Sequence, residues 1–332
     1  MAIQVIALGG TIAMTNSGGQ GVVPALSGET LVMAVPALKQ VAEIETTSFR
    51  QLPGAHLRFG DLEALAGLIE DAVWRGAQGI VVTQGTDTIE ETAFALDRLL
   101  KVEVPVVVTG AMRNPTLPGA DGPANLLAAA RVAASQVARD LGVLVVMNDE
   151  IHAARFVRKM HTSSPAAFAS AILGPIGMVA EGRVRILVHP KRIPPLARLK
   201  VAIEAPVALI TFGLGDDGRM LRAAVEAGYS GVVIEGMGGG HVSEPAADEV
   251  GRAAQVVPVI LASRTGAGEV LRETYGFVGS EIDLQQRGVI RAGWLDALKA
   301  RVLLSLALRG GAGPEAVVGL FAPWGAEGAP SE

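Results

Sequence analysis

Short, fully apolar runs alternate with helical patterns along this chain, and this alternation constrains the fold more than any other feature. In the first half, the apolar runs are 3–8, 79–82, 104–108 and 142–147, and the helical patterns cover 29–38, 62–73, 89–100 and 123–139. Ser27 is placed to cap the first of these helices. Strands that are apolar on both faces are typical of a parallel sheet covered by helices on both sides. We therefore predict a doubly wound α/β domain.

A basic segment with several prolines, 185–206, interrupts this alternation and has the composition of a linker. Beyond it the alternation resumes, with apolar runs at 207–212, 231–234 and 257–262 and helices near 220–227, 245–254 and 295–309. The α/β fold class therefore comprises two doubly wound domains with mainly parallel sheets. We predict a larger N-terminal domain over 1–185, a linker over 186–206, a smaller C-terminal domain over 207–324 and a disordered tail over 325–332.

Composition excludes several classes of function. No segment reaches the roughly 20 uninterrupted apolar residues of a membrane span, and residues 1–13 carry no basic signal region. The chain has no cysteine, a net charge of -5 and only 4% aromatic residues. These values leave no disulfide or thiolate chemistry and argue against binding of nucleic acid. We expect a cytoplasmic protein that acts on a small polar molecule and binds neither nucleic acid nor membrane.

Two glycine-flanked threonines directly follow predicted strands. They are the Thr11 of Gly9-Gly10-Thr11 and the Thr86 of Gly85-Thr86-Asp87-Thr88. Ligands of α/β proteins bind at the carboxyl ends of the strands, and glycine there lets the backbone bend sharply and approach a substrate closely. One such sequence is compatible with an ordinary turn. Two of them, the second with an aspartate, indicate a chemical site.

Other site types fit the sequence less well. The segment after Leu8 lacks the G-x-G-x-x-G spacing of a dinucleotide loop, no Gly-Lys pair suggests a P-loop, and no G-x-S-x-G elbow occurs. None of the five histidines is in a His-x-x-x-His arrangement, so we expect surface or hydrogen-bonding roles for them rather than metal ligation. We expect neither a metal nor a cofactor.

Threonine needs a neighbouring base to act as a nucleophile, and lysine can supply it. Lys159 follows the predicted strand 142–147 and its turn. Loops after neighbouring strands of a doubly wound sheet converge at one edge, so Lys159 is able to reach Thr86. The alternative, a solvated surface lysine, stays open on spacing alone.

Several motifs together resemble one family. Leu8–Ala13 and Gln84–Ala93 are similar to the two signatures of bacterial-type L-asparaginases and glutaminase-asparaginases. Supporting stretches occur in the family's order at 34–36, 109–113, 120–126, 142–149, 275–277 and 299–304. The likeness runs from about Ile3 to Leu308.

The resemblance implies catalytic roles for four residues. Thr11 matches the nucleophile of the first signature, and Thr86 and Asp87 match the threonine and aspartate of the second. Lys159 matches the family's lysine, which serves as base or proton shuttle, is oriented by the aspartate, and works with the second threonine to position the attacking group. Asp87 also resembles the residue that binds the substrate's α-amino group. Backbone N–H groups near Thr86 would stabilise the oxyanion of the tetrahedral intermediate.

The same match predicts the substrate-binding residues, which are Gly54, Ala55, His56, Gly85, Thr86, Asp87 and Ala111. Two departures from the family's pattern stand out. The loop from Asn16 to Pro24 lacks the tyrosine that activates the first threonine, and Pro53-Gly54-Ala55-His56 replaces the Ser-Gln pair that binds the substrate carboxylate. The backbone N–H of Gly54 and the ring of His56 are the groups available in its place.

The family resemblance implies hydrolysis of L-asparagine to L-aspartate and ammonia, without a cofactor, by a homotetramer built from close dimers. A glutaminase-asparaginase of broader specificity is one alternative. A weakly active amino-acid-binding relative that lacks the tyrosine is another. The glycine-rich stretch Gly236–His241 corresponds to the place where the family's C-terminal domain approaches a neighbouring subunit's site, and a simple structural turn is an equal alternative.

Overall fold

The chain folds as two compact units. The computed structural model describes residues 1–16, 22–24, 27–197 and 203–325, and the units are Met1–Pro195 and Leu196–Glu332. Each unit is built from a sheet covered by helices, so the predicted two-domain α/β fold is confirmed. The exact bounds of the predicted linker, 186–206, stay a prediction. The predicted disordered tail, 325–332, lies outside the described residues except for Gly325.

The N-terminal unit contains an eight-stranded sheet in the order β12-β11-β8-β7-β6-β5-β1-β4. The strands from β4 to β7 are parallel, and β8, β11 and β12 extend the sheet in antiparallel fashion. The elements are β1 (Ala2–Ala7), β2 (Met14–Asn16), β3 (Val22–Pro24), α1 (Gly28–Met33), β4 (Glu43–Ser48), α2 (Phe59–Trp74), β5 (Gly79–Thr83), α3 (Ile89–Leu99), β6 (Val106–Thr109), α4 (Gly122–Ala133), β7 (Val143–Met147), β8 (Glu150–Ala153), β9 (Arg158–Lys159), β10 (Phe168–Ala169), β11 (Gly177–Ala180) and β12 (Arg183–Ile186).

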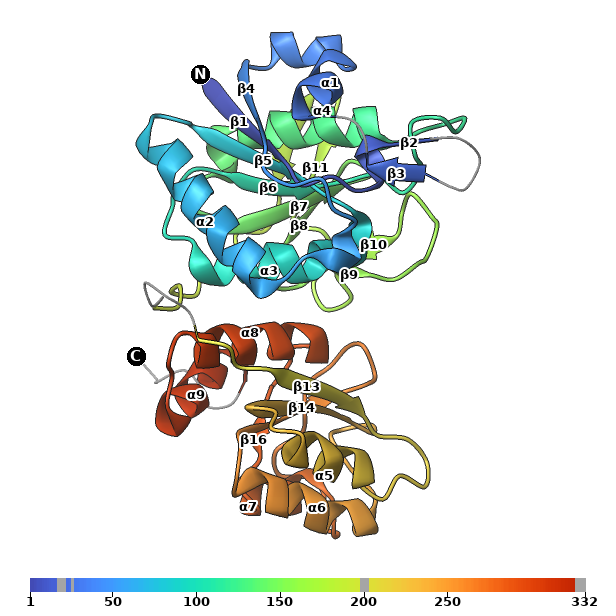
Figure 1. Cartoon of the computed structure of the whole chain (residues 1–332), viewed down its shortest axis with the longest axis vertical. Coiled ribbons are helices and arrows are strands. Elements are labelled where there is room, and N and C mark those ends of the chain that lie inside the picture. Colours follow the sequence, from blue (N-terminus) through green and yellow to red (C-terminus); the bar gives the residue numbers. More distant parts are fainter. Residues whose placement is uncertain (17–21, 25–26, 198–202, 326–332) are drawn as a thin grey trace. The chain divides into compact units, whose positions relative to one another are not determined.

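Helices cover both faces of this sheet. In Figure 1, α1 and α4 lie on one side of the strands and α2 and α3 on the other. The strands β5, β6 and β7 are buried along their whole length, which explains their uninterrupted apolar sequences. A central cluster of apolar side chains from β1, β5, β6, β7, α1 and α4 forms a core of this unit.

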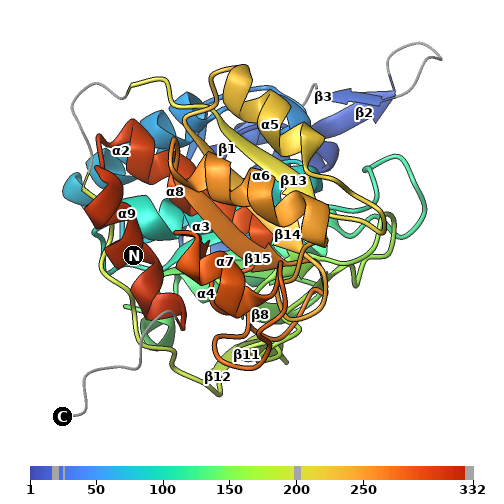
Figure 2. The ribbon, with the colours of Figure 1, turned by 90° about the horizontal axis from the view of Figure 1, so that it is seen from below.

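The C-terminal unit has a four-stranded parallel sheet in the order β13-β14-β15-β16. Helix α8 packs on β13, β14 and β15, and Figure 2 shows α5 and α6 side by side on this unit. The elements are β13 (Val207–Thr211), α5 (Arg219–Glu226), β14 (Gly231–Gly236), α6 (Glu244–Ala254), β15 (Val259–Ser263), α7 (Glu281–Gln286), β16 (Ile290–Arg291), α8 (Ala297–Arg309) and α9 (Pro314–Phe321).

Two predicted helices are shorter than expected. The helix predicted over 29–38 ends at Met33, and a separate 3₁₀ turn begins at Pro36. Proline lacks the N–H that a continuing helix requires and disfavours helical geometry in the preceding residue. The predicted cap is confirmed, because the Ser27 hydroxyl accepts a hydrogen bond from the Thr30 N–H. The helix predicted over 123–139 ends at Ala133, and a short 3₁₀ turn follows over Gln136–Ala138.

Three arginines hold the segment 191–194 against the N-terminal unit. Arg98, whose side chain is 1% exposed, donates to the backbone carbonyl oxygens of Ile193 and Pro194. Arg155 donates to a third carbonyl of the segment, that of Lys191, and Arg192 donates back to a carbonyl and a carboxylate of neighbouring loops. Burial lowers the pKa of Arg98, and the Asp97 carboxylate opposes that shift. These hydrogen bonds dock the end of the unit on its own core.

A backbone contact between Gly10 and Gly85 joins the ends of β1 and β5. Gly10 has a φ of +84°, and a Cβ there would lie 2.0 Å from the Gly85 nitrogen. The parallel register that pairs Ala7 with Thr83 brings the two loops together. Only glycine is compatible with both the backbone angle and the distance.

We expect Gly10→Ala to destabilise the fold far more than Gly76→Ala. Gly76 also has a positive φ, +108°, but nothing lies within 4 Å of its added Cβ. The control should lose about 1–2 kcal/mol from backbone strain alone, and Gly10→Ala should lose a further ~1–3 kcal/mol from overpacking. Equilibrium urea unfolding measures both free energies, and equal losses would contradict the contact.

Candidate active site

The predicted site lies where the strand order of the large sheet reverses. From β1 the chain moves to β4 on one side of it and then to β5 on the other. The loops after β1 and β5 therefore lie at the carboxyl ends of neighbouring strands, at the switch point where ligands bind in open α/β sheets. Thr11 and Thr86 belong to these two loops.

Lys159 reaches the second threonine signature from a distant part of the chain. Its Nζ lies 2.9 Å from Oγ1 of Thr86 and 3.0 Å from Oδ1 of Asp87. The side chain of Lys159 is 16% exposed and that of Asp87 is 65% exposed, whereas Thr86 is buried. The structure thus brings together three of the four predicted catalytic residues, with the amine between the hydroxyl and the carboxylate.

The first threonine follows the Gly10–Gly85 contact directly. Thr11 begins a 3₁₀ turn, Thr11–Ala13, after Gly10, so its backbone lies next to the loop that carries Thr86. The Thr11 side chain lies outside the described part of the structure. At the loop from Asn16 to Pro24, β2 and β3 form an antiparallel pair that sets Asn16 opposite Val22, and residues 17–21 lie outside the described residues.

The predicted carboxylate-binding segment packs against the Thr86 loop. Thr88 Oγ1 donates to the Gly54 carbonyl at 3.0 Å, and a Cβ on Gly54 would lie 2.9 Å from the Gly85 carbonyl oxygen. Gly54 and Gly85 are buried, while Ala55 and His56 are exposed at the end of the 3₁₀ turn Gly54–His56. These two side chains are therefore accessible from solvent at this edge of the sheet.

Ala111 is placed differently from the other predicted binding residues. The whole residue is 0% exposed and belongs to the apolar core, so neither its side chain nor its backbone is accessible to a ligand in this structure. Asp121 fixes this loop, because its carboxylate accepts the N–H groups of Met112 and Arg113. Asn125, one helical turn later, donates to the Gly110 carbonyl.

Asp121 and Asn125 are not among the predicted site residues, although they fix the loops around the site. The amide of Asn125 also donates to the Asp121 carboxylate, at 3.1 Å, and its oxygen accepts the N–H of Asn148 in the turn after β7. The two residues thereby hold the loops after β6 and β7 in fixed positions. The i, i+4 spacing of two short polar residues at a helix start was the available signal.

His241 belongs to a compact cluster in the C-terminal unit. Its Nε2 lies 3.1 Å from Oε2 of Glu281, and its ring contacts the rings of Tyr275 and Phe277 edge to face. Burial alone would raise the pKa of Glu281, but the backbone N–H groups that it accepts, including those of Tyr275 and Thr274, hold it below its usual range. The stretch Gly236–His241 is thus at least an ordered structural turn.

The part of the chain that the structure describes contains neither a cluster of metal-ligating side chains nor a helix able to cross a bilayer. No group of three or more His, Cys, Asp or Glu side chains is arranged to hold a metal ion. Within the same ranges, no helix has the length and apolar character needed to cross a bilayer.

Comparison with known proteins identifies the family. Models of the asparaginase N-terminal domain and of the glutaminase/asparaginase C-terminal domain match residues 2–192 and 206–321. A probable L-asparaginase of Deinococcus radiodurans is 37% identical over 324 residues, which cover 96% of this chain and 96% of that protein. A glutaminase-asparaginase of Pseudomonas fluorescens is 34% identical over 325 residues, covering 92% and 86% of the two chains.

A solved structure agrees with these relatives. The crystal structure of a probable cytoplasmic L-asparaginase from Campylobacter jejuni superimposes with a TM-score of 0.88 at 30% identity, over 96% of this chain and 98% of that one. Both domain models match in order, and the similarity extends over nearly the whole chain. This chain belongs to the asparaginase family of amidohydrolases.

Proposed function

We propose that this protein hydrolyses L-asparagine to L-aspartate and ammonia through a threonine-dependent acyl transfer. The observation that carries the proposal is the position of Lys159 Nζ between the Thr86 hydroxyl and the Asp87 carboxylate, at 2.9 and 3.0 Å. A lysine that is oriented by a carboxylate and bonded to a positioning hydroxyl is suited to take the proton from a nearby nucleophile, for which we propose Thr11.

In the proposed mechanism, Thr11 is the nucleophile. Its oxygen adds to the side-chain amide carbon of the substrate, and its proton passes to the Lys159 amine, which takes part in this step in its unprotonated form. The Asp87 carboxylate compensates the ammonium charge that forms, and Thr86 positions the attacking group. Backbone N–H groups near Thr86 stabilise the oxyanion. Collapse of the intermediate breaks the C–N bond, and the proton leaves with the nitrogen as ammonia.

Water completes the cycle in the same geometry. It attacks the Thr11 ester with loss of a proton to Lys159, and the ester C–O bond breaks as Thr11 regains a proton. The products are L-aspartate and the free enzyme, so atoms and charges balance without a cofactor. We propose that the segment Gly54–His56 and Gly85 bind the substrate carboxylate and that Asp87 binds its α-amino group, while Ala111 supports the site from the core.

The proposed assembly is a homotetramer of close dimers, which rests on the family resemblance. The proposed location is the cytoplasm. It is supported by the similarity to the probable cytoplasmic L-asparaginase of Campylobacter jejuni, whereas a Haemophilus influenzae relative is a probable periplasmic L-asparaginase.

The purified protein should release ammonia from L-asparagine. We expect turnover of L-asparagine to exceed that of L-glutamine in a coupled ammonia assay with each amide at the same concentrations. Faster turnover of glutamine would favour the glutaminase-asparaginase alternative. Binding of asparagine without release of ammonia, measured by calorimetry, would favour the amino-acid-binding relative and contradict the proposed function.

Lys159→Met and Thr86→Val should each lower turnover by at least ~100-fold, which is the lower end of the range for one positioned acid–base group. Lys101→Met, at an exposed lysine that follows α3, is the matched control and should keep full turnover. Steady-state kinetics with L-asparagine measures all three. Near-normal rates in either site variant would remove that residue from the mechanism.

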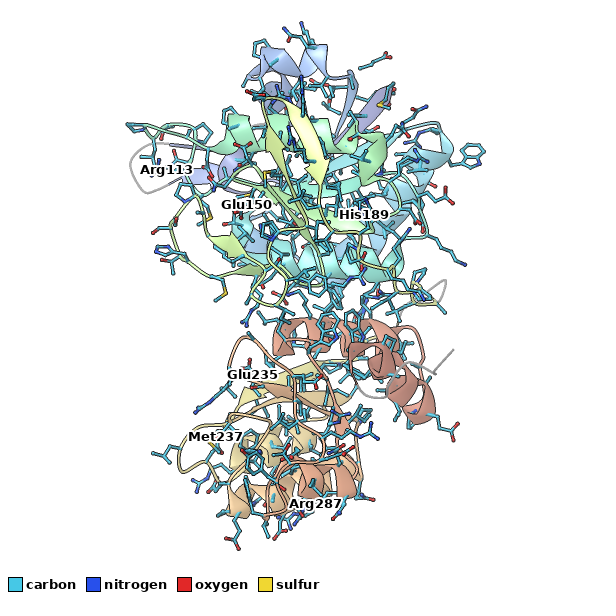
Figure 3. The ribbon with its side chains drawn as sticks, turned by 180° about the vertical axis from the view of Figure 1, so that it is seen from behind. Arg113, Glu150, His189, Glu235, Met237 and Arg287 are labelled. Carbon is cyan, nitrogen blue, oxygen red and sulfur yellow. The ribbon has the colours of Figure 1, made fainter. Side chains whose placement is uncertain are left out.

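His56→Ala should raise KM for L-asparagine roughly 10-fold and leave kcat nearly unchanged, because it removes one hydrogen bond to a charged group of the substrate. His189→Ala, at an exposed histidine that follows β12, is the control. Figure 3 labels His189 on the N-terminal unit. An unchanged KM in His56→Ala would assign carboxylate binding to backbone groups alone.

A further inference from the structure

A buried histidine lies behind the hairpin that carries Lys159. His152 is on β8, and its side chain is completely buried. Its Nδ1 lies 3.0 Å from the hydroxyl oxygen of Ser170, and its Nε2 lies 3.2 Å from Oε2 of Glu150. Ser170 is also buried, whereas the Glu150 side chain, labelled in Figure 3, is 45% exposed. The contact between His152 and Ser170 thus joins β8 to the residue that directly follows β10, although β8 and β10 are not paired with each other.

The surroundings of His152 determine its protonation state. Burial lowers its pKa, and the charge of Glu150 opposes that shift without reversing it. The ring is therefore neutral at neutral pH. Of the two neutral tautomers, the Nε2–H form turns its proton toward the Glu150 carboxylate, which lies at ion-pair distance but is not aligned for a hydrogen bond, and it leaves the Nδ1 lone pair for Ser170. In that form the Ser170 hydroxyl donates to Nδ1, so the histidine is an acceptor for Ser170.

Ser170 is directly connected to the strand pair that holds Lys159. It follows β10, and β10 pairs with β9 in an antiparallel register that sets Phe168 opposite Lys159. The Met160 N–H also donates to the Ala167 carbonyl at 2.6 Å. Any displacement of β10 therefore moves β9 with it. His152 belongs to the large sheet, where it is paired with Val145 of β7. Its contact with Ser170 therefore ties the hairpin to that sheet.

We propose that His152 is a positioning residue, which accepts the Ser170 hydroxyl, anchors the β9–β10 hairpin to the large sheet and keeps Lys159 within hydrogen-bonding distance of Thr86. The inference rests on the proposed function of Lys159 as the base. His152 touches neither the substrate nor the reacting atoms, so its contribution is geometric. A misplacement of about 1 Å in a catalytic group costs up to ~100-fold in rate.

The test compares kcat and KM for L-asparagine in four variants. His152→Leu and Ser170→Ala each remove one partner and should each lower kcat roughly 10- to 100-fold, with KM within about 2-fold of the wild type because the binding loops follow other strands. The double variant should lose no more than the worse single one, since both changes remove the same contact. His152→Asn keeps an acceptor at the position of Nδ1 and should recover most of the lost rate.

Ser305→Ala is the matched control. Ser305 is a buried serine of α8 whose hydroxyl has no hydrogen-bond partner among the described residues, so its loss should change neither kcat nor Tm. Circular dichroism and Tm show which variants fold. If His152→Leu does not fold, Ser170→Ala and His152→Asn carry the test.

Three results would overturn the inference. The first is a normal kcat in folded Ser170→Ala and His152→Leu. The second is a rise in KM alone, and the third is a loss of kcat that His152→Asn does not recover. Failure of the proposed function is distinguishable, because an inactive wild type, or an active Lys159→Met variant, removes Lys159 as the base before any His152 variant is considered.

Discussion

The close contact between the backbones of Gly10 and Gly85 is the constraint on which the site depends. The parallel pairing of β1 and β5 aligns their ends, but it does not set how closely the two following loops approach. That approach is set by the absence of a side chain at Gly10, where a Cβ would overlap the Gly85 nitrogen. Gly54 approaches the same loop from a third direction. The two threonine signatures therefore meet because their flanking residues are glycines.

The charges at the site do not by themselves explain its geometry. Lys159 and Asp87 form an ion pair, but the Asp87 side chain is 65% exposed, and an exposed ion pair contributes only about 0–1 kcal/mol to stability. Such a pair is too weak to hold the amine beside Thr86 against the flexibility of a long side chain. The position of Lys159 must therefore come from the backbone of its hairpin and from the elements behind it.

The sequence predicted the parts of this structure that one-dimensional patterns encode. The strands β5, β6 and β7 are buried on both faces, so their apolar runs were evident, and the cap at Ser27 follows from local chemistry. The edge strand β4 was not predicted, because it is half exposed and its sequence, EIETTS, lacks an apolar run. The pairs β8–β11 and β11–β12 were also missed, since short antiparallel strands depend on tertiary neighbours.

For the site, too, the sequence indicated some features, and others were evident only in the folded structure. The pairing of Lys159 with Thr86 was a hypothesis from sheet topology and family resemblance, and the structure places the two atoms 2.9 Å apart. Ala111 showed no sign in the sequence that its side chain lies in the core. His152 gave no signal at all, because a lone histidine in a strand has the same sequence pattern whether it is solvated or buried. Its significance depends on Ser170, which only the folded hairpin brings beside it.

The docking of residues 191–194 changes where this protein can be divided. Arg98 and Arg155 donate to backbone carbonyls of that segment, and a buried cation that loses such acceptors is costly. The family model for the N-terminal domain ends at residue 192, two carbonyls short of what Arg98 requires. The compact N-terminal unit, Met1–Pro195, includes these carbonyls, so a fragment that stops at residue 192 would leave Arg98 without the two acceptors that it uses.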